Sequence, residues 1–182
     1  MSPRPQVPAG IRTIALVGLR ASGKSTVGRE LAARLGWPFV DGDERLGAVA
    51  GRPAGHCLAE WGEAVFRDLE EAIVLAELAS PGPRVLATGG GAVTRSAVRA
   101  ALREATCATV WLQVAEATLV ARLQADPTPR PALTAAPDVA AEVALLAARR
   151  RPLYAAVARL TMAAMAPAAE VAAAILTALA AR

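Results

Sequence analysis

Residues 18 to 25 read Gly18-Leu-Arg-Ala-Ser-Gly23-Lys24-Ser25. This run matches the pattern G-x-x-x-x-G-K-[S/T] of a phosphate-binding loop, in which backbone amides and one lysine surround the phosphates of a nucleotide. Lys24 is the only lysine in the chain. The other nineteen of the 20 Lys and Arg residues are arginine. An ammonium on a flexible stem acts as a compact point charge, whereas a guanidinium is a planar fork. The loop therefore predicts binding of a nucleoside triphosphate.

The motif has the neighbours that such a loop requires. Residues 11–17 form a β-branched and aliphatic run that ends at Gly18, which predicts a buried strand. Residues 25–35 carry apolar side chains at helical spacing and stop at Gly36, which predicts a helix. This context argues against a chance glycine-rich turn. We expect the loop amides and the helix start to face phosphate oxygens. The expected nucleotide contacts include Ala21, Ser22, Gly23, Lys24, Ser25 and Thr26.

Two roles within the loop follow from its chemistry. Lys24 is expected to bridge the β- and γ-phosphates, and the Ser25 hydroxyl is expected to ligate Mg²⁺. The motif itself carries no information about the group that accepts the phosphate.

Strand and helix patterns alternate along the rest of the chain. Further strands are expected at residues 37–40, 85–87, 109–114 and near 160, and further helices at 63–79, 96–104, 116–125, 138–151 and 168–181. Such alternation predicts a parallel sheet covered by helices on both faces. We expect one α/β domain over residues 11–182, a flexible tail at residues 1–10, and a proline-rich lid around residues 123–137.

Composition narrows the function classes. Alanine makes up about a quarter of the chain and accounts for much of its 54% hydrophobic content. The most apolar stretch, residues 171–181, is shorter than the roughly 20 residues of a membrane span. Two cysteines and one histidine form neither a disulfide framework nor a metal cluster. A net charge of +4 with 3% aromatic residues suits a small anionic substrate at least as well as nucleic acid. We therefore expect a cytoplasmic monomer without nucleic-acid or membrane partners.

Two carboxylates follow the second expected strand. Asp41 and Asp43 stand two residues apart, and such residues at a strand end point the same way. One carboxylate can then lie near the metal while the other accepts a proton from an attacking hydroxyl. An ordinary Asp-Gly-Asp turn is the alternative interpretation.

Several residues are candidates for holding an acceptor. Arg67 and Glu70 lie three apart on one expected helix, so Glu70 can orient Arg67 toward an anion, unless the two form only a solvated ion pair. Residues 89–91 are three glycines after a strand, which suits either close approach of a ligand or a tight turn. Of the three arginines at 149–151, one or two can face a cleft, because successive helical residues diverge by about 100°. Arg122 and Arg130 flank the proline-rich break.

Taken together, these pieces resemble the shikimate kinase family. The resemblance extends over nearly the whole chain after the tail, and the stretches appear in family order. They are residues 18–28, 39–43, 62–70, 88–93, 130–131 and 150–154. The phosphate loop is common to many kinases, whereas the Asp-x-Asp, Phe-Arg-x-x-Glu and Gly-Gly-Gly-Ala set is far more specific.

The resemblance implies a P-loop fold like that of nucleoside monophosphate kinases, a three-layer α/β/α arrangement with a five-stranded parallel sheet. It also implies Mg²⁺-dependent transfer of the ATP γ-phosphoryl group to the 3-hydroxyl of shikimate, a step toward aromatic amino acids. In this sequence Asp43 resembles the residue that binds the shikimate hydroxyls and serves as base. The other implied roles are carboxylate binding by Arg67 and Arg150, pocket lining by Gly90 and Gly91, γ-phosphate contact by Arg130, adenine packing by Arg122 and a place near Mg²⁺ for Asp41.

Alternatives remain open, and the sequence departs from the family at several positions, of which Ala21 lies in the phosphate loop. Another small-molecule kinase, such as one for gluconate, or a non-catalytic nucleotide-binding module would share the loop. Ala21 replaces a glycine that is frequent in the family, so we expect its backbone to avoid positive φ.

Overall fold

The structure, a computed structural model, describes residues 7–126 and 132–181. Its core is a five-stranded, wholly parallel sheet with the order β2-β3-β1-β4-β5. The strands are β1 (Thr13–Val17), β2 (Phe39–Asp41), β3 (Arg84–Ala87), β4 (Cys107–Gln113) and β5 (Leu160–Ala163). The predicted fold class is confirmed.

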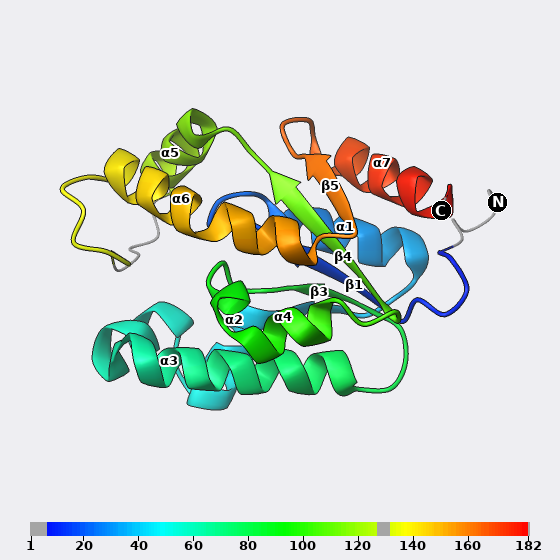
Figure 1. Ribbon diagram of the computed structural model, residues 1–182, viewed down its shortest axis with the longest axis horizontal. Coiled ribbons are helices and arrows are strands. Elements are labelled where there is room, and N and C mark those ends of the chain that lie inside the picture. The colour runs from blue at the N-terminus through cyan, green and yellow to red at the C-terminus, as the bar shows by residue number, and fades with distance from the viewer. Residues whose placement is uncertain (1–6, 127–131, 182) are drawn as a thin grey trace.

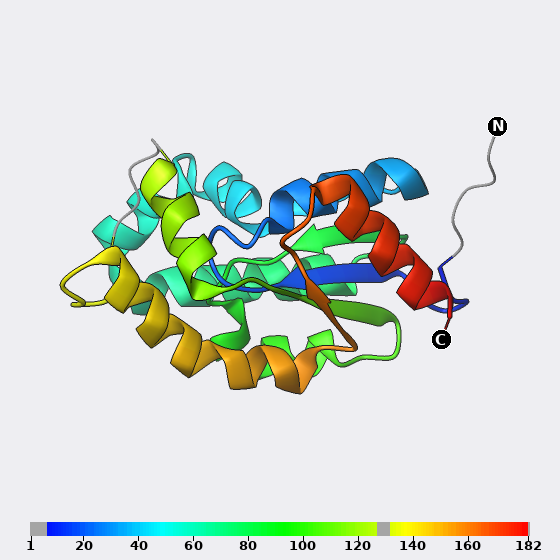
Figure 2. The same ribbon diagram turned by 90° about the horizontal axis from the view of Figure 1, so that it is seen from above.

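Helices cover both faces of this sheet, as Figures 1 and 2 show. The helices are α1 (Lys24–Leu35), α2 (Gly42–Ala50), α3 (Ala54–Ala79), α4 (Ser96–Leu102), α5 (Glu116–Ala125), α6 (Val139–Val157) and α7 (Ala168–Ala180), with a 3-10 turn at Ala92–Thr94. Helices α1 and α7 lie on one face, while α4 and α6 lie on the other (Figure 2). Helix α3 packs along α4, and α2 packs on α3. None of the helices in the described part is long and apolar enough to cross a membrane.

Strand β1 lies at the centre of the sheet because its side chains are apolar on both faces. Ile14 through Val17 are completely buried, as is typical of a parallel strand with helices above and below. The phosphate loop leaves the carboxyl end of this strand, at the edge where α/β sheets bind their ligands. The rigid centre of the fold thus positions the loop.

Most element boundaries agree with the sequence, but α2 and the first part of α3 were missed, and the predicted end of α6 was wrong. No helix was predicted at α2, because two glycines interrupt its short apolar pattern. The helix predicted over residues 63–79 matches the part of α3 that follows the kink at Gly62, at φ 79°, whereas the part of α3 that begins at Ala54 was missed. Helix α6 continues through Pro152 to Val157, since buried Tyr154 and Val157 hold its last turns against the core despite the lost backbone hydrogen bond.

Candidate active site

The phosphate loop closes between β1 and α1 through a left-handed backbone. Gly23, the N-cap of α1, has φ 90°. Ala21 has φ 60°, so the expectation that it avoids positive φ was wrong. The loop keeps its left-handed turn although alanine stands where glycine is frequent. Ala21 therefore carries backbone strain.

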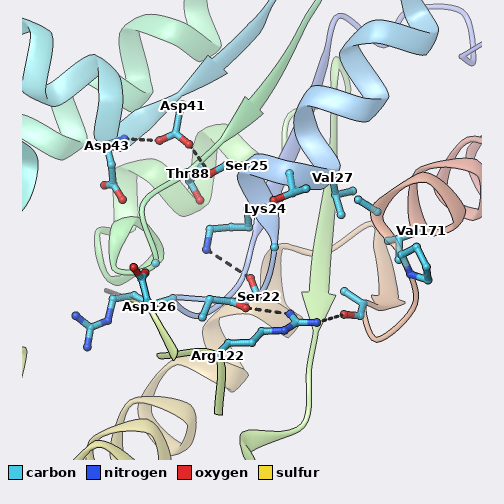
Figure 3. A pocket seen from close by; sticks show the side chains of 18 of the residues that line it. Ser22, Lys24, Ser25, Val27, Asp41, Asp43, Thr88, Arg122, Asp126 and Val171 are labelled. Atoms are coloured by element: carbon cyan, nitrogen blue, oxygen red, sulfur yellow. Dashed lines mark hydrogen bonds between the residues drawn. The ribbon is translucent and has the colours of Figure 1, made fainter. Parts of the chain in front are cut away.

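Lys24 folds back over its own loop. Its Nζ donates to the carbonyl oxygens of Leu19 at 2.8 Å and Gly18 at 3.0 Å, and lies 3.5 Å from Ser22 Oγ. Figure 3 shows the ammonium in the middle of the cleft, between the two aspartates and Arg122. The charge thus lies beside the amides that a phosphate would contact.

Asp41 and Asp43 are brought together by a helix start, and not by the predicted continuation of the strand. Asp41 ends β2 and is the N-cap of α2, where its Oδ1 accepts from the amides of Asp43 at 3.0 Å and Glu44 at 3.3 Å. Its Oδ2 accepts from Ser25 Oγ at 2.5 Å (Figure 3). Both aspartates line the same cleft, as expected. The expected reason, a strand that continues through both residues, was wrong, because α2 begins at Gly42.

The cleft has a volume of about 730 Å³ and runs along the phosphate loop. Predicted residues in its lining are Ala21, Ser22, Gly23, Lys24, Ser25, Thr26, Asp41, Asp43, Gly90 and Arg122. Asp43 and Val171 lie toward opposite ends of this cleft (Figure 3). Arg130, predicted to reach the γ-phosphate, lies outside the described residues. Arg67, Arg150 and Gly91 are absent from the lining and lie beside it.

The three glycines let charged side chains approach the backbone closely. A Cβ on Gly91 would lie 2.2 Å from the Arg67 guanidinium carbon, and one on Gly89 would lie 2.0 Å from Glu70 Oε1 and 3.0 Å from Asp43 Oδ1. Within the protein the close approach is made by Arg67 and Glu70, and close approach of a ligand stays a prediction. A cluster of two acids and a guanidinium thus packs against this loop, the acceptor-side loop (residues 89–91).

Arg67 is oriented by its helix neighbours, as predicted. Its Nη1 donates to Glu70 Oε2 at 2.6 Å, and its Nε lies 3.4 Å from Glu63 Oε1. Arg67 is 6% exposed and Glu70 is 3% exposed, so this is a buried pair and not a solvated one. Burial raises the pKa of Glu70, and the charge of Arg67 opposes this shift without cancelling it.

Arg150 is the arginine of its triplet that faces inward. Arg149 is exposed, and Arg151 pairs at the surface with Glu116 at 3.0 Å, whereas Arg150 is 4% exposed. Its Nη1 is buried and has no hydrogen-bond partner among the described residues. Burial lowers the pKa of Arg150. Since a buried, unpaired N–H is costly, this atom suits an anionic ligand.

Tyr154, one turn further along α6, was missed as a site residue. Its hydroxyl donates to Gly90 O at 2.6 Å, so α6 holds the acceptor-side loop directly. Burial raises the pKa of Tyr154 and keeps it a donor. Its place in the stretch at residues 150–154 was the available sequence signal.

Arg122 connects the loop with the far end of the cleft. Its Nη1 donates to Ala21 O at 3.0 Å and its Nη2 to Ala164 O at 3.4 Å. Beyond it, the described lining is apolar and small: Ala164, Ala166, Pro167, Ala168 and Val171. Small apolar side chains beside one guanidinium suit the face of a nucleotide base.

Ser25 and Asp41 fit a nucleotide-bound magnesium ion. Mg²⁺ keeps most of its waters and takes one or two protein oxygens together with phosphate oxygens. One hydroxyl and one carboxylate already in contact provide such a set. In the described part of the chain there is no group of three or more His, Cys, Asp or Glu side chains that could form an all-protein metal site.

Comparisons with known proteins agree with this site. The family model described as "Shikimate kinase" matches residues 20–180. A shikimate kinase of Nitrobacter winogradskyi is 45% identical over 155 residues, which cover 84% of this chain and 71% of that protein. One of Nitratidesulfovibrio vulgaris is 48% identical over 146 residues, covering 79% and 82%.

Solved structures show the same relationship. The structure of the Acinetobacter baumannii shikimate kinase in complex with shikimate superposes with a TM-score of 0.86 at 31% identity, covering 94% of each chain. A gluconokinase of Sinorhizobium meliloti is 22% identical with a TM-score of 0.53, a likeness in fold alone. The family model matches nearly the whole chain, and two shikimate kinases are 45% and 48% identical to it, which leads to a single assignment. The chain belongs to the shikimate kinase family.

Proposed function

We propose that the chain catalyses transfer of the ATP γ-phosphoryl group to the 3-hydroxyl of shikimate, with Mg²⁺, giving shikimate 3-phosphate. The observation that carries this proposal is the pair of buried guanidinium groups, Arg67 and Arg150, at the acceptor-side loop. A planar carboxylate is matched by such forked donors. The relatives named above, one with shikimate bound, support the same acceptor.

Asp43 is assigned as the base that accepts the hydroxyl proton. It lies in the first turn of α2, at the boundary between the cleft and the acceptor-side loop, where its Oδ1 approaches Gly89. A hydroxyl held by Asp43, with the substrate carboxylate on Arg67 and Arg150, would face the end of the triphosphate beside Lys24. Positioning of this kind supplies most of the catalysis in phosphoryl transfer.

Charge neutralisation is assigned to Lys24 and Arg130, with the metal held by Ser25 and, through water, by Asp41. The amides of residues 21–26 are assigned to the phosphates, and Arg122 to the adenine face. When bound, Mg²⁺ would offset the charge of the phosphate oxygens. A monomeric, cytoplasmic enzyme without nucleic-acid partners remains our expectation.

The acceptor is tested by measuring ATP consumption with shikimate and with gluconate at equal concentrations. We expect turnover with shikimate only. Turnover of gluconate alone would overturn the assignment, and so would failure of both acceptors with ATP bound, which would indicate a non-catalytic module.

The role of Asp43 is tested by the variant Asp43→Asn. The amide cannot accept the proton, so we expect kcat to fall by about 10²-fold or more. ATP binding, followed by calorimetry, should persist because the phosphate loop is intact. An unchanged kcat would show that another group accepts the proton.

A further inference from the structure

Glu142, in the first turn of α6, is a buried acid with two partners from distant parts of the chain. Its side chain is 9% exposed and forms an ion pair with Arg20 through Oε1. Its Oε2 accepts from the Leu133 amide at 2.7 Å. An acid is favourable near a helix N-terminus, but that effect needs no burial. Asp138 already caps α6 by accepting from the Ala141 amide at 2.8 Å. Capping therefore does not account for Glu142.

Arg20 belongs to the part of the phosphate loop that lies between the expected phosphate site and the acceptor-side loop. The preceding carbonyl, Leu19 O, accepts from Lys24 Nζ and from the Ser22 amide at 3.3 Å. On the other side, a Cβ on Gly90 would lie 3.3 Å from Gly18 O and 3.5 Å from Arg20 N. Residues 18–20 thus form a wall shared by the phosphate loop and the acceptor-side loop.

We propose that Glu142 is a positioning residue that acts through Arg20 to fix this shared wall against the start of α6. The same side chain holds the Leu133 amide, so one carboxylate joins the phosphate loop to the segment leading into α6. The inference rests on the proposed function, since it concerns the alignment of phosphate and acceptor. None of the family stretches quoted above includes Glu142, and no direct contact with either substrate is assigned to it.

A kinetic signature follows from the placement of the two substrates. The amides at the start of α1 hold the phosphates whether or not Arg20 is anchored, so ATP affinity should change little. The relative placement of phosphate and hydroxyl depends on the shared wall, and small displacements of reacting groups cost rate. Loss of Glu142 should therefore lower kcat more than it raises the KM for ATP.

The test is a double-mutant cycle with Glu142→Ala and Arg20→Ala. We expect Glu142→Ala to lower kcat about tenfold and to raise the KM for ATP less than about threefold. In the Arg20→Ala background, adding Glu142→Ala should change kcat less than about twofold, because the route through Arg20 is already lost. Glu142→Gln, which keeps one acceptor oxygen, should give an intermediate kcat. Additive losses from the two substitutions would overturn the proposal.

A matched control separates positioning from general stability. Glu77 pairs with Arg84 at 2.7 Å with similar burial, on α3 and away from the cleft. Glu77→Ala should lower the thermal midpoint while leaving kcat unchanged. Equal losses of kcat in Glu77→Ala and Glu142→Ala would show that Glu142 is merely structural.

Hydrogen exchange provides a readout that needs no acceptor. Amides of residues 18–20, the shared wall, should exchange faster in Glu142→Ala than in the unsubstituted chain or in Glu77→Ala. Unchanged exchange rates would overturn the proposal that Glu142 fixes this segment through Arg20. If the unsubstituted chain fails to phosphorylate shikimate, the proposed function fails, and the exchange experiment still decides whether Glu142 holds the loop.

Discussion

At the residue scale, Ala21 shows that the fold of a loop can override the preference of alanine for negative φ. Its φ of 60° lies where an L-residue is strained, yet the loop needs that turn between β1 and α1. The side chain packs against the apolar core, and the Ala21 carbonyl accepts from Arg122. These contacts hold the strained backbone in place.

Replacing Ala21 with glycine should therefore stabilise the protein. Relief of left-handed strain exceeds the extra chain entropy of glycine, so we expect the free energy of unfolding to rise by about 1 kcal/mol. Urea denaturation measures it. Ala33→Gly, at an exposed position inside α1, is the matched control and should lower stability by about 1 kcal/mol. A loss of stability in both variants would mean that Ala21 carries no strain.

Asp41 has two roles that one substitution can separate. In Asp41→Asn the side-chain oxygen can still cap α2, since Asn caps as well as Asp, but the charge near the metal is lost. We expect the Mg²⁺ concentration for half-maximal activity to rise on the order of tenfold. The thermal midpoint should barely change. A large drop in the midpoint with an unchanged Mg²⁺ requirement would assign Asp41 to the helix alone.

At the element scale, the acceptor-side loop works by leaving room for side chains from α3 and α6. Arg67 and Glu70 come from α3, while Arg150 and Tyr154 come from α6. The two helices are far apart in sequence and meet at these glycines, where Tyr154 holds Gly90 O. The loop is thus a junction between elements as well as a surface for a ligand.

Gly91→Ala tests this junction. The new Cβ would overlap the Arg67 guanidinium at 2.2 Å, and Arg67 must move away from its place beside Glu70. We expect the KM for shikimate to rise by about tenfold or more, the cost of losing a charged hydrogen bond. The KM for ATP in the same variant is the internal control and should stay constant. Equal changes in both constants would point to general damage.

At the whole-molecule scale, the alternation of strands and helices predicted the sheet and its central phosphate loop. Local patterns could not predict helix α2, whose start depends on the Asp41 cap, or the continuation of α6 through Pro152, which depends on packing against the core. The pairing of Arg20 with Glu142, 122 residues away, left no signal in either local stretch. Motifs therefore identified most candidate residues, while tertiary contacts determine how they meet.

The free energy of unfolding of the whole protein should depend on pH because Glu70 is buried. Its pKa is raised above the ordinary 4.5, so between 4.5 and the folded value the native state binds more protons than the unfolded chain. The contribution of Glu70 to stability must fall as the pH rises through this window. Urea denaturation from pH 4 to 7 should show the free energy of unfolding of the unsubstituted chain falling relative to that of Glu70→Gln. Parallel curves would contradict the raised pKa.

The proposed reaction is the transfer of a phosphoryl group from ATP to one hydroxyl of shikimate. The direct measurement is ³¹P and ¹H NMR of the products formed from ATP, Mg²⁺ and shikimate, with an identical mixture lacking shikimate beside it. We expect one phosphate monoester, coupled to the proton at carbon 3, and an equal amount of ADP, with no ADP in the control. ADP formed at the same rate without shikimate, or phosphate on another hydroxyl, would contradict it.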